Sequence, residues 1–215
     1  MLFPLSNVVL FPATVVPLHV FEERYRQMTS DALAGDRTIG MIAVHPRHVA
    51  EMPGDPPLFE VGCAGVIDRW EELPDGRYQF ILAATHRFRI VRELPRGESR
   101  LYRVADVEAL AEPFPPEDAP AVRSLRSAVI DRFGELAALA APERSSEVSS
   151  ALFDGVDDVR LLNTLCQLLD LATAEKQDLL EANGVRQRYE RLHRLLDFRV
   201  AEQRSSTGAP GPLRH

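Results

Sequence analysis

A proline-rich segment divides the chain into two parts of different character. The segment from Pro113 to Pro120 reads PFPPEDAP and carries four prolines in eight residues. Proline fixes the φ angle and has no amide hydrogen, so this segment can continue neither a strand ladder nor a helix. We therefore expect one domain at 1–116, a second at 117–203, and a disordered tail at 204–215, where the sequence is polar and rich in Gly and Pro.

The first part alternates short β-type runs with turn signals. Prolines interrupt the apolar run at 7–20, which predicts an extended edge segment, and helical spacing then predicts one short helix over 21–35. Further strands are predicted at 38–45, at 58–73 and 77–84 on either side of an Asp75-Gly76 turn, and in the sequences RFRIVREL and LYRVADVEAL. These runs indicate a small, strongly bent sheet or barrel with one early helix.

The second part has helical periodicity throughout. Apolar side chains recur at helical spacing from Val122 towards Pro142 and again over 157–171. A third helix is predicted to be capped by Thr173, and a fourth to begin at Val185 after the Asn183-Gly184 pair. A β-rich part followed by a helical part makes the expected fold class α+β.

Composition limits the compartment and the kinds of partner. The chain has 32 acidic and 25 basic residues, and its formal charge of -7 argues against broad binding to nucleic acid or to anionic membranes. It has neither a signal-peptide pattern nor an apolar run long enough to cross a membrane, so a cytoplasmic protein is expected. Cys63 and Cys166 stand singly in apolar surroundings, as reduced core thiols do.

No pattern in the sequence indicates catalysis or a cofactor. Lys176 is the single lysine and has no glycine-rich loop before it, which excludes a P-loop ATPase and leaves it as part of a solvated helix face. The six histidines show neither HExxH spacing nor a zinc pattern with the cysteines, and there is no G-x-S-x-G motif or dinucleotide loop. We therefore expect no metal, no cofactor and no enzyme activity. A hydrolase would need a cleft of convergent titratable groups that the spacing does not reveal.

Two surface features remain as candidates for binding. His86, Arg87, Arg89 and Arg92 form a basic stripe interleaved with Phe88, which fits either a nucleic-acid contact or, as we favour, a half-buried strand with its arginines in water. In the loop PRHVAEMPGDPP, Val49 and Met52 lie outside any periodic element and are able either to contact a partner or to pack back onto the domain. Trp70 is expected to be a cross-strand packing residue.

Five segments in order resemble one known family. PLSNVVLFPATVVPLHVFEERYRQM resembles the opening of the Lon protease N-terminal domain family, and the similarity continues through FEVGCAGVIDRWEELPDGRYQFIL, HRFRIVREL and LYRVADVEAL. It resumes at LLNTLCQLLDLATAEKQDLLEANGVRQRYERLHRLL, so that it covers roughly Leu2 to Val200. The resemblance implies a six-stranded, PUA-like β pseudo-barrel with one inserted helix, followed by a C-terminal helical bundle.

The resemblance also implies a role in substrate recognition. In the complete protease this domain helps to hold unfolded or tagged proteins for an ATPase ring and a serine-lysine peptidase. This chain is expected to be a stand-alone bacterial member without the ATPase and peptidase domains. It is therefore expected to be a non-enzymatic module that binds unfolded or apolar protein segments or regulates proteolysis. Full-length Lon or another protease is an expected partner, and a membrane is not.

Specific residues follow for each hypothesis. For protein binding we expect Glu23 and Arg24, at the strand-to-helix junction, together with Val49 and Met52. The alternative is an RNA-binding PUA-like module, for which the expected contacts are Arg87, Phe88 and Arg89.

Overall fold

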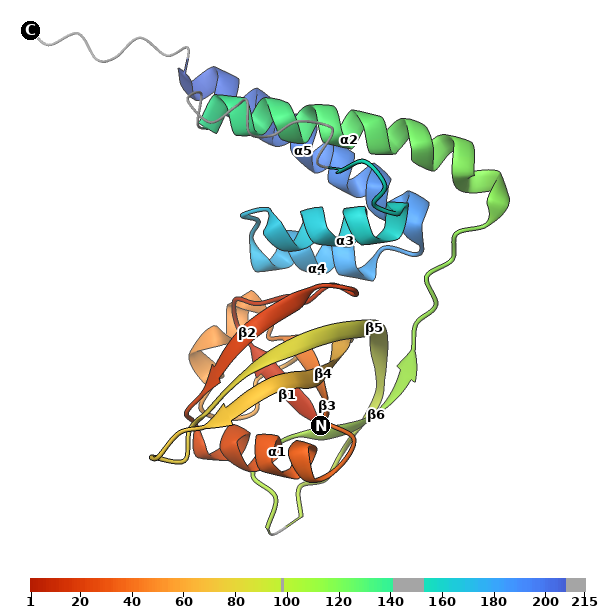
Figure 1. Cartoon of the computed structure of the whole chain (residues 1–215). Coiled ribbons are helices and arrows are strands. Elements are labelled where there is room, and N and C mark those ends of the chain that lie inside the picture. Colours follow the sequence, from red (N-terminus) through yellow and green to blue (C-terminus); the bar gives the residue numbers. More distant parts are fainter. Residues whose placement is uncertain (98, 141–152, 208–215) are drawn as a thin grey trace, which may run out of the picture. The chain divides into compact units, whose positions relative to one another are not determined.

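The computed structural model describes residues 1–97, 99–140 and 153–207, and it divides into two compact units (Figure 1). The first, which we call the sheet unit, comprises Met1–Ala111 and Asn163–Glu181, and the second, the helical unit, comprises Glu112–Leu162 and Ala182–His215. The change of unit after Ala111 lies close to the expected boundary at 116. The return of Asn163–Glu181 to the sheet unit differs from the linear division at 1–116 and 117–203.

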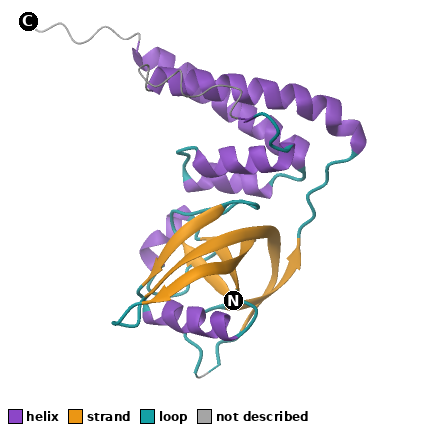
Figure 2. Ribbon diagram, viewed as in Figure 1, coloured by secondary structure: helices purple, strands orange, loops and turns teal. Residues whose placement is uncertain are grey.

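The sheet unit is built on a mixed, open, six-stranded sheet (Figure 2). Its strands are β1 (Leu2–Leu5), β2 (Val15–Val20), β3 (Thr38–Ala43), β4 (Val61–Glu72), β5 (Tyr78–Leu94) and β6 (Val104–Ala109). The strand order is β1-β3-β4-β5-β2, and β6 pairs with β5. The β1 and β3 strands are parallel, whereas the other pairs are antiparallel. The expected number of strands is confirmed, and β1 and β2 form the two ends of the path.

The local predictions agree with the structure where turn and helix signals are strong. Helix α1 (Glu23–Ala34) lies between β2 and β3, as expected for the inserted helix. Gly76 has a φ of 74° in the turn between β4 and β5, where the Asp75-Gly76 pair predicts the hairpin. One prediction was wrong in detail, because the runs at 77–84 and RFRIVREL form the single strand β5. The short strand β1 was not predicted.

The centre of the sheet unit is apolar. Its main cluster brings together side chains from the sheet, from α1, from the segment between β1 and β2 and from the segment after β5, including Leu10, Met28, Ile67, Leu82 and Tyr102. A smaller cluster contains Leu2, Ile42, Ala64 and Phe88. Burial of these side chains is the main force that holds the sheet in its bent form.

Two glycines make room for the ring of Phe88. A β-carbon on Gly62 would lie 2.5 Å from this ring and 2.4 Å from the carbonyl oxygen of Met41, and one on Gly40 would lie 2.9 Å from the ring. Contacts this short are repulsive, so any larger residue at Gly62 would push the strands apart.

Helices from the second half of the chain complete the sheet unit. Helix α4 (Thr173–Glu181) is tied to the strands by Gln177, whose Nε2 donates to the carbonyl oxygen of Val61 at 2.9 Å. Thr173 donates to the carbonyl oxygen of Ser6 at 3.1 Å. Thr173 thus lies inside the helix and bonds to the loop after β1, whereas a capping role was predicted for it.

The helical unit contains α2 (Ala119–Ala140), the first part of α3 (Asp158–Leu168), and α5 (Val185–Thr207). These helices confirm the expected helical region. Helix α5 includes the first residues of the predicted tail at 204–215, and 208–215 lie outside the described residues. Gly184, with a φ of 93°, starts α5 against Pro113, where a β-carbon would lie 2.8 Å from the proline carbonyl oxygen. Among the described residues, no helix is both long and apolar enough to span a membrane.

Candidate protein-binding surface

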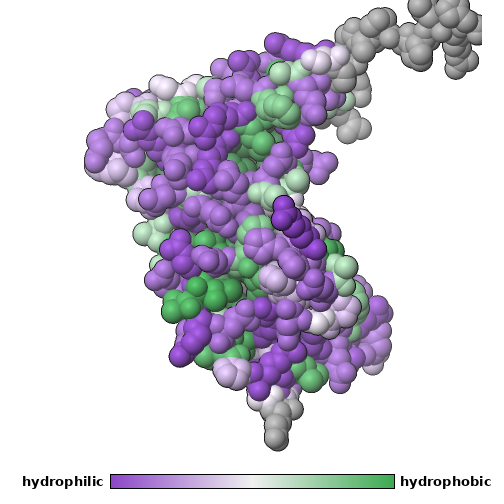
Figure 3. Space-filling view, turned by 180° about the vertical axis from the view of Figure 1, so that it is seen from behind, coloured by the Kyte–Doolittle hydropathy of each residue, from purple (hydrophilic) through white to green (hydrophobic). Residues whose placement is uncertain are grey.

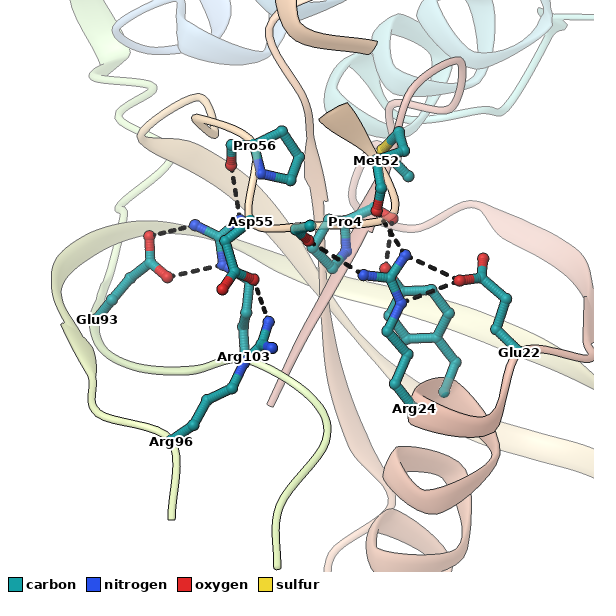
Figure 4. Close-up of polar contacts among 11 residues, drawn as sticks. Pro4, Glu22, Arg24, Met52, Asp55, Pro56, Glu93, Arg96 and Arg103 are labelled. Atoms are coloured by element: carbon teal, nitrogen blue, oxygen red, sulfur yellow. Dashed lines mark hydrogen bonds and ion pairs between the residues drawn. The ribbon is translucent and has the colours of Figure 1, made fainter. Parts of the chain in front are cut away.

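Arg24 joins the start of α1 to the loop that precedes β4. Its Nη2 donates to the carbonyl oxygen of Met52 at 2.7 Å, and its Nη1 donates to that of Gly54 at 3.3 Å. Its Nε donates to Glu22 at 3.0 Å, and its guanidinium lies 4.6 Å from the centre of the Tyr25 ring. Figure 4 shows the guanidinium between helix and loop. The structure therefore brings together Arg24 and Met52, two of the residues expected to bind protein, and gives Arg24 a positioning role.

A second arginine holds the other end of the same loop. The Nη1 of Arg103 donates to the carbonyl oxygen of Pro56 at 2.7 Å, while its Nη2 and Nε donate to the two carboxylate oxygens of Glu93 at 2.6 and 2.8 Å (Figure 4). Arg96 forms an ion pair with Asp55 beside it. We call these contacts, together with those of Arg24, the arginine clamp. The clamp fixes the loop by its carbonyl oxygens.

Val49 and Glu23, the other two residues expected to bind protein, do not form one site with Arg24. Val49 lies on the short helix η1 (Pro46–Glu51) and is 40% exposed, so it is accessible to a partner. Glu23 is exposed and lines a polar groove of about 470 Å³ with Phe21 and Tyr78. The four expected residues are thus divided between a clamped loop and a groove beside α1.

The sequence interpretation missed an apolar groove that crosses β2, β5 and β4. We call this shallow groove the Trp70 groove, and its volume is about 440 Å³. It is lined by Pro17, Leu18, His19, Arg69, Trp70, Glu71, Gln79, Phe80 and Ile81. Trp70 was expected to pack across strands, and its ring does lie 6.5 Å from that of Tyr78, yet the residue is 46% exposed. Its position in the polar run DRWEE, just before the hairpin turn, was the available signal of exposure.

A β-bulge brings consecutive residues of β4 into this groove. Ile67 pairs with Leu82 and Trp70 pairs with Phe80, so two residues of β4 lie opposite Ile81 alone. Such a bulge re-aims side chains and increases the local twist of the strand. This is why Arg69, Trp70 and Glu71 line the groove together.

Apolar surface continues beyond the groove. Val15 on β2 is 62% exposed and Phe21, next to the end of β2, is 64% exposed. Figure 3 shows hydrophobic surface gathered on the sheet unit within a mainly hydrophilic exterior. Large exposed apolar side chains near a concave site are typical of binding surfaces.

The Trp70 groove is lined by one basic side chain, Arg69, and one acidic side chain, Glu71, besides His19. Glu71 lines the Trp70 groove, and the next residue, Glu72, lines the polar groove beside α1. Burial and the neighbouring Glu72 carboxylate raise the pKa of Tyr78 above its ordinary value. Arg69 lies 3.7 Å from Asp68, so part of its charge is balanced locally.

The basic stripe considered for RNA is divided, since Arg87 and Phe88 are buried whereas His86, Arg89 and Arg92 are exposed. Arg87 is 2% exposed and donates to the carbonyl oxygens of Leu180 and Ala111 at 2.7 and 2.9 Å. Phe88 is also 2% exposed, and Arg89 lies 3.7 Å from Glu108. The expectation that the arginines face water was wrong for Arg87, because carbonyl oxygens distant in sequence bind its guanidinium.

Metal coordination finds no support in the described part of the chain. Within residues 1–97, 99–140 and 153–205, no group of three or more His, Cys, Asp or Glu side chains is arranged to hold a metal ion. Cys63 and Cys166 are both buried thiols.

Comparison with known proteins identifies relatives over nearly the whole chain. Lon protease from Flavobacterium johnsoniae is 30% identical over 193 residues, which cover 87% of this chain and 22% of that protein. Lon protease from Brucella suis is 29% identical over 199 residues, which cover 93% of this chain and 23% of that protein. The chain thus spans less than a quarter of the length of these relatives.

Solved structures show the same fold. The Lon N-terminal domain protein from Xanthomonas campestris has a TM-score of 0.57 and 23% identity, and the match covers 92% of this chain and 96% of that one. The N-terminal domain of the Mycobacterium avium complex Lon protease has a TM-score of 0.67 and 17% identity, with coverage of 94% and 97%. The family model of the ATP-dependent protease La (LON) substrate-binding domain matches residues 1–197. The chain therefore belongs to the LON substrate-binding domain family.

Proposed function

We propose that this chain is a non-enzymatic protein-binding module that takes apolar segments of other proteins into the Trp70 groove. The observation that carries the proposal is an exposed apolar groove, with Trp70 46% exposed beside it, in a member of a substrate-binding family. The PUA-like barrel description and a role as an adaptor or regulator of proteolysis belong to the same proposal.

The groove offers a favourable surface for an apolar side chain. Pro17 and Ile81 line the groove beside Trp70, whereas Leu18 and Phe80, which also line it, have their side chains against or within the apolar core. Removing apolar surface from water contributes about 25 cal/mol per Å², so covering even part of the groove would stabilise a complex. Tryptophan is among the residues that contribute most to protein interfaces when they become desolvated.

The bound segment is proposed to dock through its side chains. Strand β2 lies at one end of the strand order. A strand added beside it would have to accept hydrogen bonds from the backbone amides of β2. Pro17 lies in the middle of β2 and has no amide hydrogen, which blunts this edge against strand addition.

The clamped loop is proposed as a second contact area. Val49 is exposed on η1, and Met52 is partly exposed beside it, so both offer apolar atoms to a partner. In this proposal Glu23 contributes charge from the polar groove beside α1, and Arg24 positions the loop.

Binding to a permanently unfolded polypeptide tests the proposal. We expect Trp70→Ala to weaken the affinity for a reduced and S-carboxymethylated model polypeptide by about ten-fold or more, measured by titration calorimetry. Val91→Ala is the matched control, because Val91 is 64% exposed on the part of β5 distant from the groove in sequence. Equal affinities for the Trp70→Ala variant and the unmodified protein would disprove the groove as the binding site. A parallel titration with purified full-length Lon tests the adaptor role.

A further inference from the structure

The outer edge of strand β6 is open, and a small apolar pocket lies beside it. We propose that β6 takes an extended segment of another protein as an added strand, with one aliphatic side chain of that segment in the pocket. This second site does not depend on the Trp70 groove, because it uses the backbone of β6 and the part of the sheet where β5 pairs with β6.

Strand β6 differs from the strands at the two ends of the strand order. Strand β5 pairs with β2 over its first half and with β6 over its second half, and β5 is the partner of β6 among the described strands (Figure 1). The end strands each contain a proline, Pro4 in β1 and Pro17 in β2, whereas β6 contains none. Proline removes an amide that an added strand would need, so β6 is the edge best able to accept one.

The pairing register shows which backbone groups of β6 face outwards. The amide of Ile90 donates at 2.8 Å to the carbonyl oxygen of Glu60, away from β6, and Ile90 lies opposite Val107. Antiparallel partners alternate between pairs that exchange hydrogen bonds and pairs that do not. The backbone groups of Val107 therefore point away from β5, as do those of Ala105 and Ala109. These three amides form no backbone hydrogen bond to any other described segment.

One contact shows that this outward row already binds backbone. Arg103 immediately precedes β6 and faces the same way as Val107, and its carbonyl oxygen accepts a hydrogen bond from the amide of Leu2 at 2.8 Å. The next groups of the row are accessible, since Val107 is 48% exposed and Ala109 is exposed. The row thus has one group used within the chain and further groups open to a partner.

The pocket explains why a side chain would be selected. It has a volume of about 120 Å³ and lies between β6 and the start of the chain, with Phe88 and Leu2 among its apolar walls. Gly40, Ala64 and Ala105 leave the space open because their side chains are small or absent. A cavity of about 150 Å³ accepts a benzene molecule, so this pocket suits a single aliphatic side chain.

The geometry of a strand matches both features. Alternate side chains of an added strand point to the same face of the sheet as Val107, which lines the pocket, while its backbone lies beside the open row. The acidic side chains of β6 are already paired, Asp106 with Arg92 at 2.6 Å and Glu108 with Arg89 at 3.7 Å. We therefore expect selection by the side chain in the pocket and not by charge.

Nuclear magnetic resonance of the full chain with synthetic peptides tests the inference. The parent probe is the capped, neutral heptapeptide Thr-Ser-Thr-Leu-Thr-Ser-Thr, which has no tryptophan. We expect it to slow hydrogen exchange at the amides of Ala105, Val107 and Ala109, and to shift their signals with saturation. Replacement of its leucine by serine should weaken binding about ten-fold, because the pocket then loses its aliphatic occupant.

Backbone methylation of the peptide distinguishes a strand from other bound forms. One variant carries N-methyl groups on its third and fifth residues, and the other carries them on its second and sixth. Successive amides of a strand face opposite edges, so one variant should bind about ten-fold more weakly and the other should bind as the parent does. Equal affinity of the two variants would overturn strand addition.

Two protein variants locate the site. Val107→Pro removes an outward amide without removing a bond to β5, so it should abolish binding while the amide signals of Asp106 and Glu108 persist. Ala105→Leu fills the pocket from within and should remove the preference for leucine over serine in the peptide. Trp70→Ala is the control, and it should leave the affinity for the parent peptide unchanged.

The remaining outcomes each decide the inference. Absence of a saturable shift at Val107 with the parent peptide would overturn it and leave binding at the Trp70 groove intact. Loss of peptide binding in Trp70→Ala would assign the peptide to that groove and overturn the second site. Slower exchange at Val107 with rising protein concentration, together with a dimer in sedimentation, would identify a second copy of this chain as the occupant and overturn the proposal of another protein.

Discussion

The two units use arginine in different ways. In the sheet unit the centre is an apolar cluster, and Arg24 and Arg103 hold a loop at the periphery. In the helical unit, helix α2 buries only Val122 and Val129. Arginines join the helices of this unit to one another. These pairs include Arg126 with Asp158 at 3.0 Å and Arg132 with Asp197 at 2.6 Å.

Arg188 is the extreme case of this difference. It is fully buried at the start of α5 and lies 3.1 Å from Glu112. A buried ion pair adds little net stability but is costly to break, because the remaining charge stays in a medium of low dielectric. Apolar burial therefore stabilises both units, since Leu162, Leu192 and Leu196 are fully buried in the helical unit, and the ion pairs between its helices act in addition to that burial.

The largest expected effect comes from removing this buried arginine. Arg188→Ala should lower the free energy of unfolding of the helical unit by about 3 kcal/mol, since Glu112 loses its buried partner. Urea unfolding followed by far-ultraviolet circular dichroism, which is dominated by the long helices, should show the loss. Fluorescence of Trp70, which lies in the sheet unit, should change less.

Arg186→Ala provides the matched control for this prediction. Arg186 lies two residues away on α5 and pairs with Asp118 at 3.0 Å, but half of its side chain is exposed. Its removal should leave the unfolding midpoint almost unchanged. If Arg188→Ala shifted the fluorescence and dichroism midpoints equally, the two units would unfold together and the comparison would fail.

A glycine substitution should produce the next largest effect, in the sheet unit. Gly62→Ala places a methyl group within 2.5 Å of the Phe88 ring and should cost about 2 kcal/mol through overpacking. Gly134→Ala on α2 is the control, because nothing lies within 4 Å of its added methyl group. It should stabilise the helix by roughly 0.5–1 kcal/mol. The unfolding midpoint is followed by Trp70 fluorescence. A midpoint for Gly62→Ala equal to that of the unmodified protein would contradict the tight packing around the Phe88 ring.

Loss of the arginine clamp should have a local effect. In Arg24→Ala, the amides of His48, Met52 and Gly54 should exchange their hydrogens about ten-fold faster, because charge-assisted bonds to the loop carbonyls are lost. Hydrogen exchange monitored by NMR resolves these positions. Arg69→Ala, an exposed arginine outside the loop, should leave their rates unchanged.

The smallest expected effect concerns alkaline pH. Burial and the hydrogen bond from Tyr102 to Asp31 at 2.7 Å raise the pKa of Tyr102 from 10.0 to about 12. The folded state holds this proton more tightly than the unfolded chain, so the stability it contributes is complete below pH 10 and is lost as the pH rises to about 12. Tyr102→Phe should reduce the alkaline loss in urea midpoints over this range. An identical slope in both proteins would show that Tyr102 does not contribute to it.

Local signals were enough to predict much of the fold. The Asp75-Gly76 turn and the helix start at Val185 both depend on the conformational preferences of adjacent residues. Strand β1 was missed because its four residues pair with β3, more than 30 residues away, through the parallel pair Leu2–Gly40 and its successors. A short apolar run has no periodicity from which pairing with so distant a strand could be predicted.

The candidate site depended more strongly on distant contacts. Arg87 is held by Leu180, 93 residues away, so its burial could not be predicted from strand alternation. The Trp70 groove requires three strands and a bulge that sequence alternation does not reveal. Val49 and Met52 were proposed because loop apolar residues without periodicity stand out locally, whereas the hydrogen bond from Arg24 to the carbonyl oxygen of Met52 depends on tertiary structure.

The arginine clamp also has an evolutionary consequence. It recognises the loop before β4 mainly through the carbonyl oxygens of Met52, Gly54 and Pro56, which every amino acid possesses. Mutations can therefore alter the side chains of this loop while its path remains fixed, much as hypervariable loops diversify on a constant framework. A family member with this arrangement could acquire new partners by drift within one short segment, and the same loop is a natural position for randomisation in a designed binder.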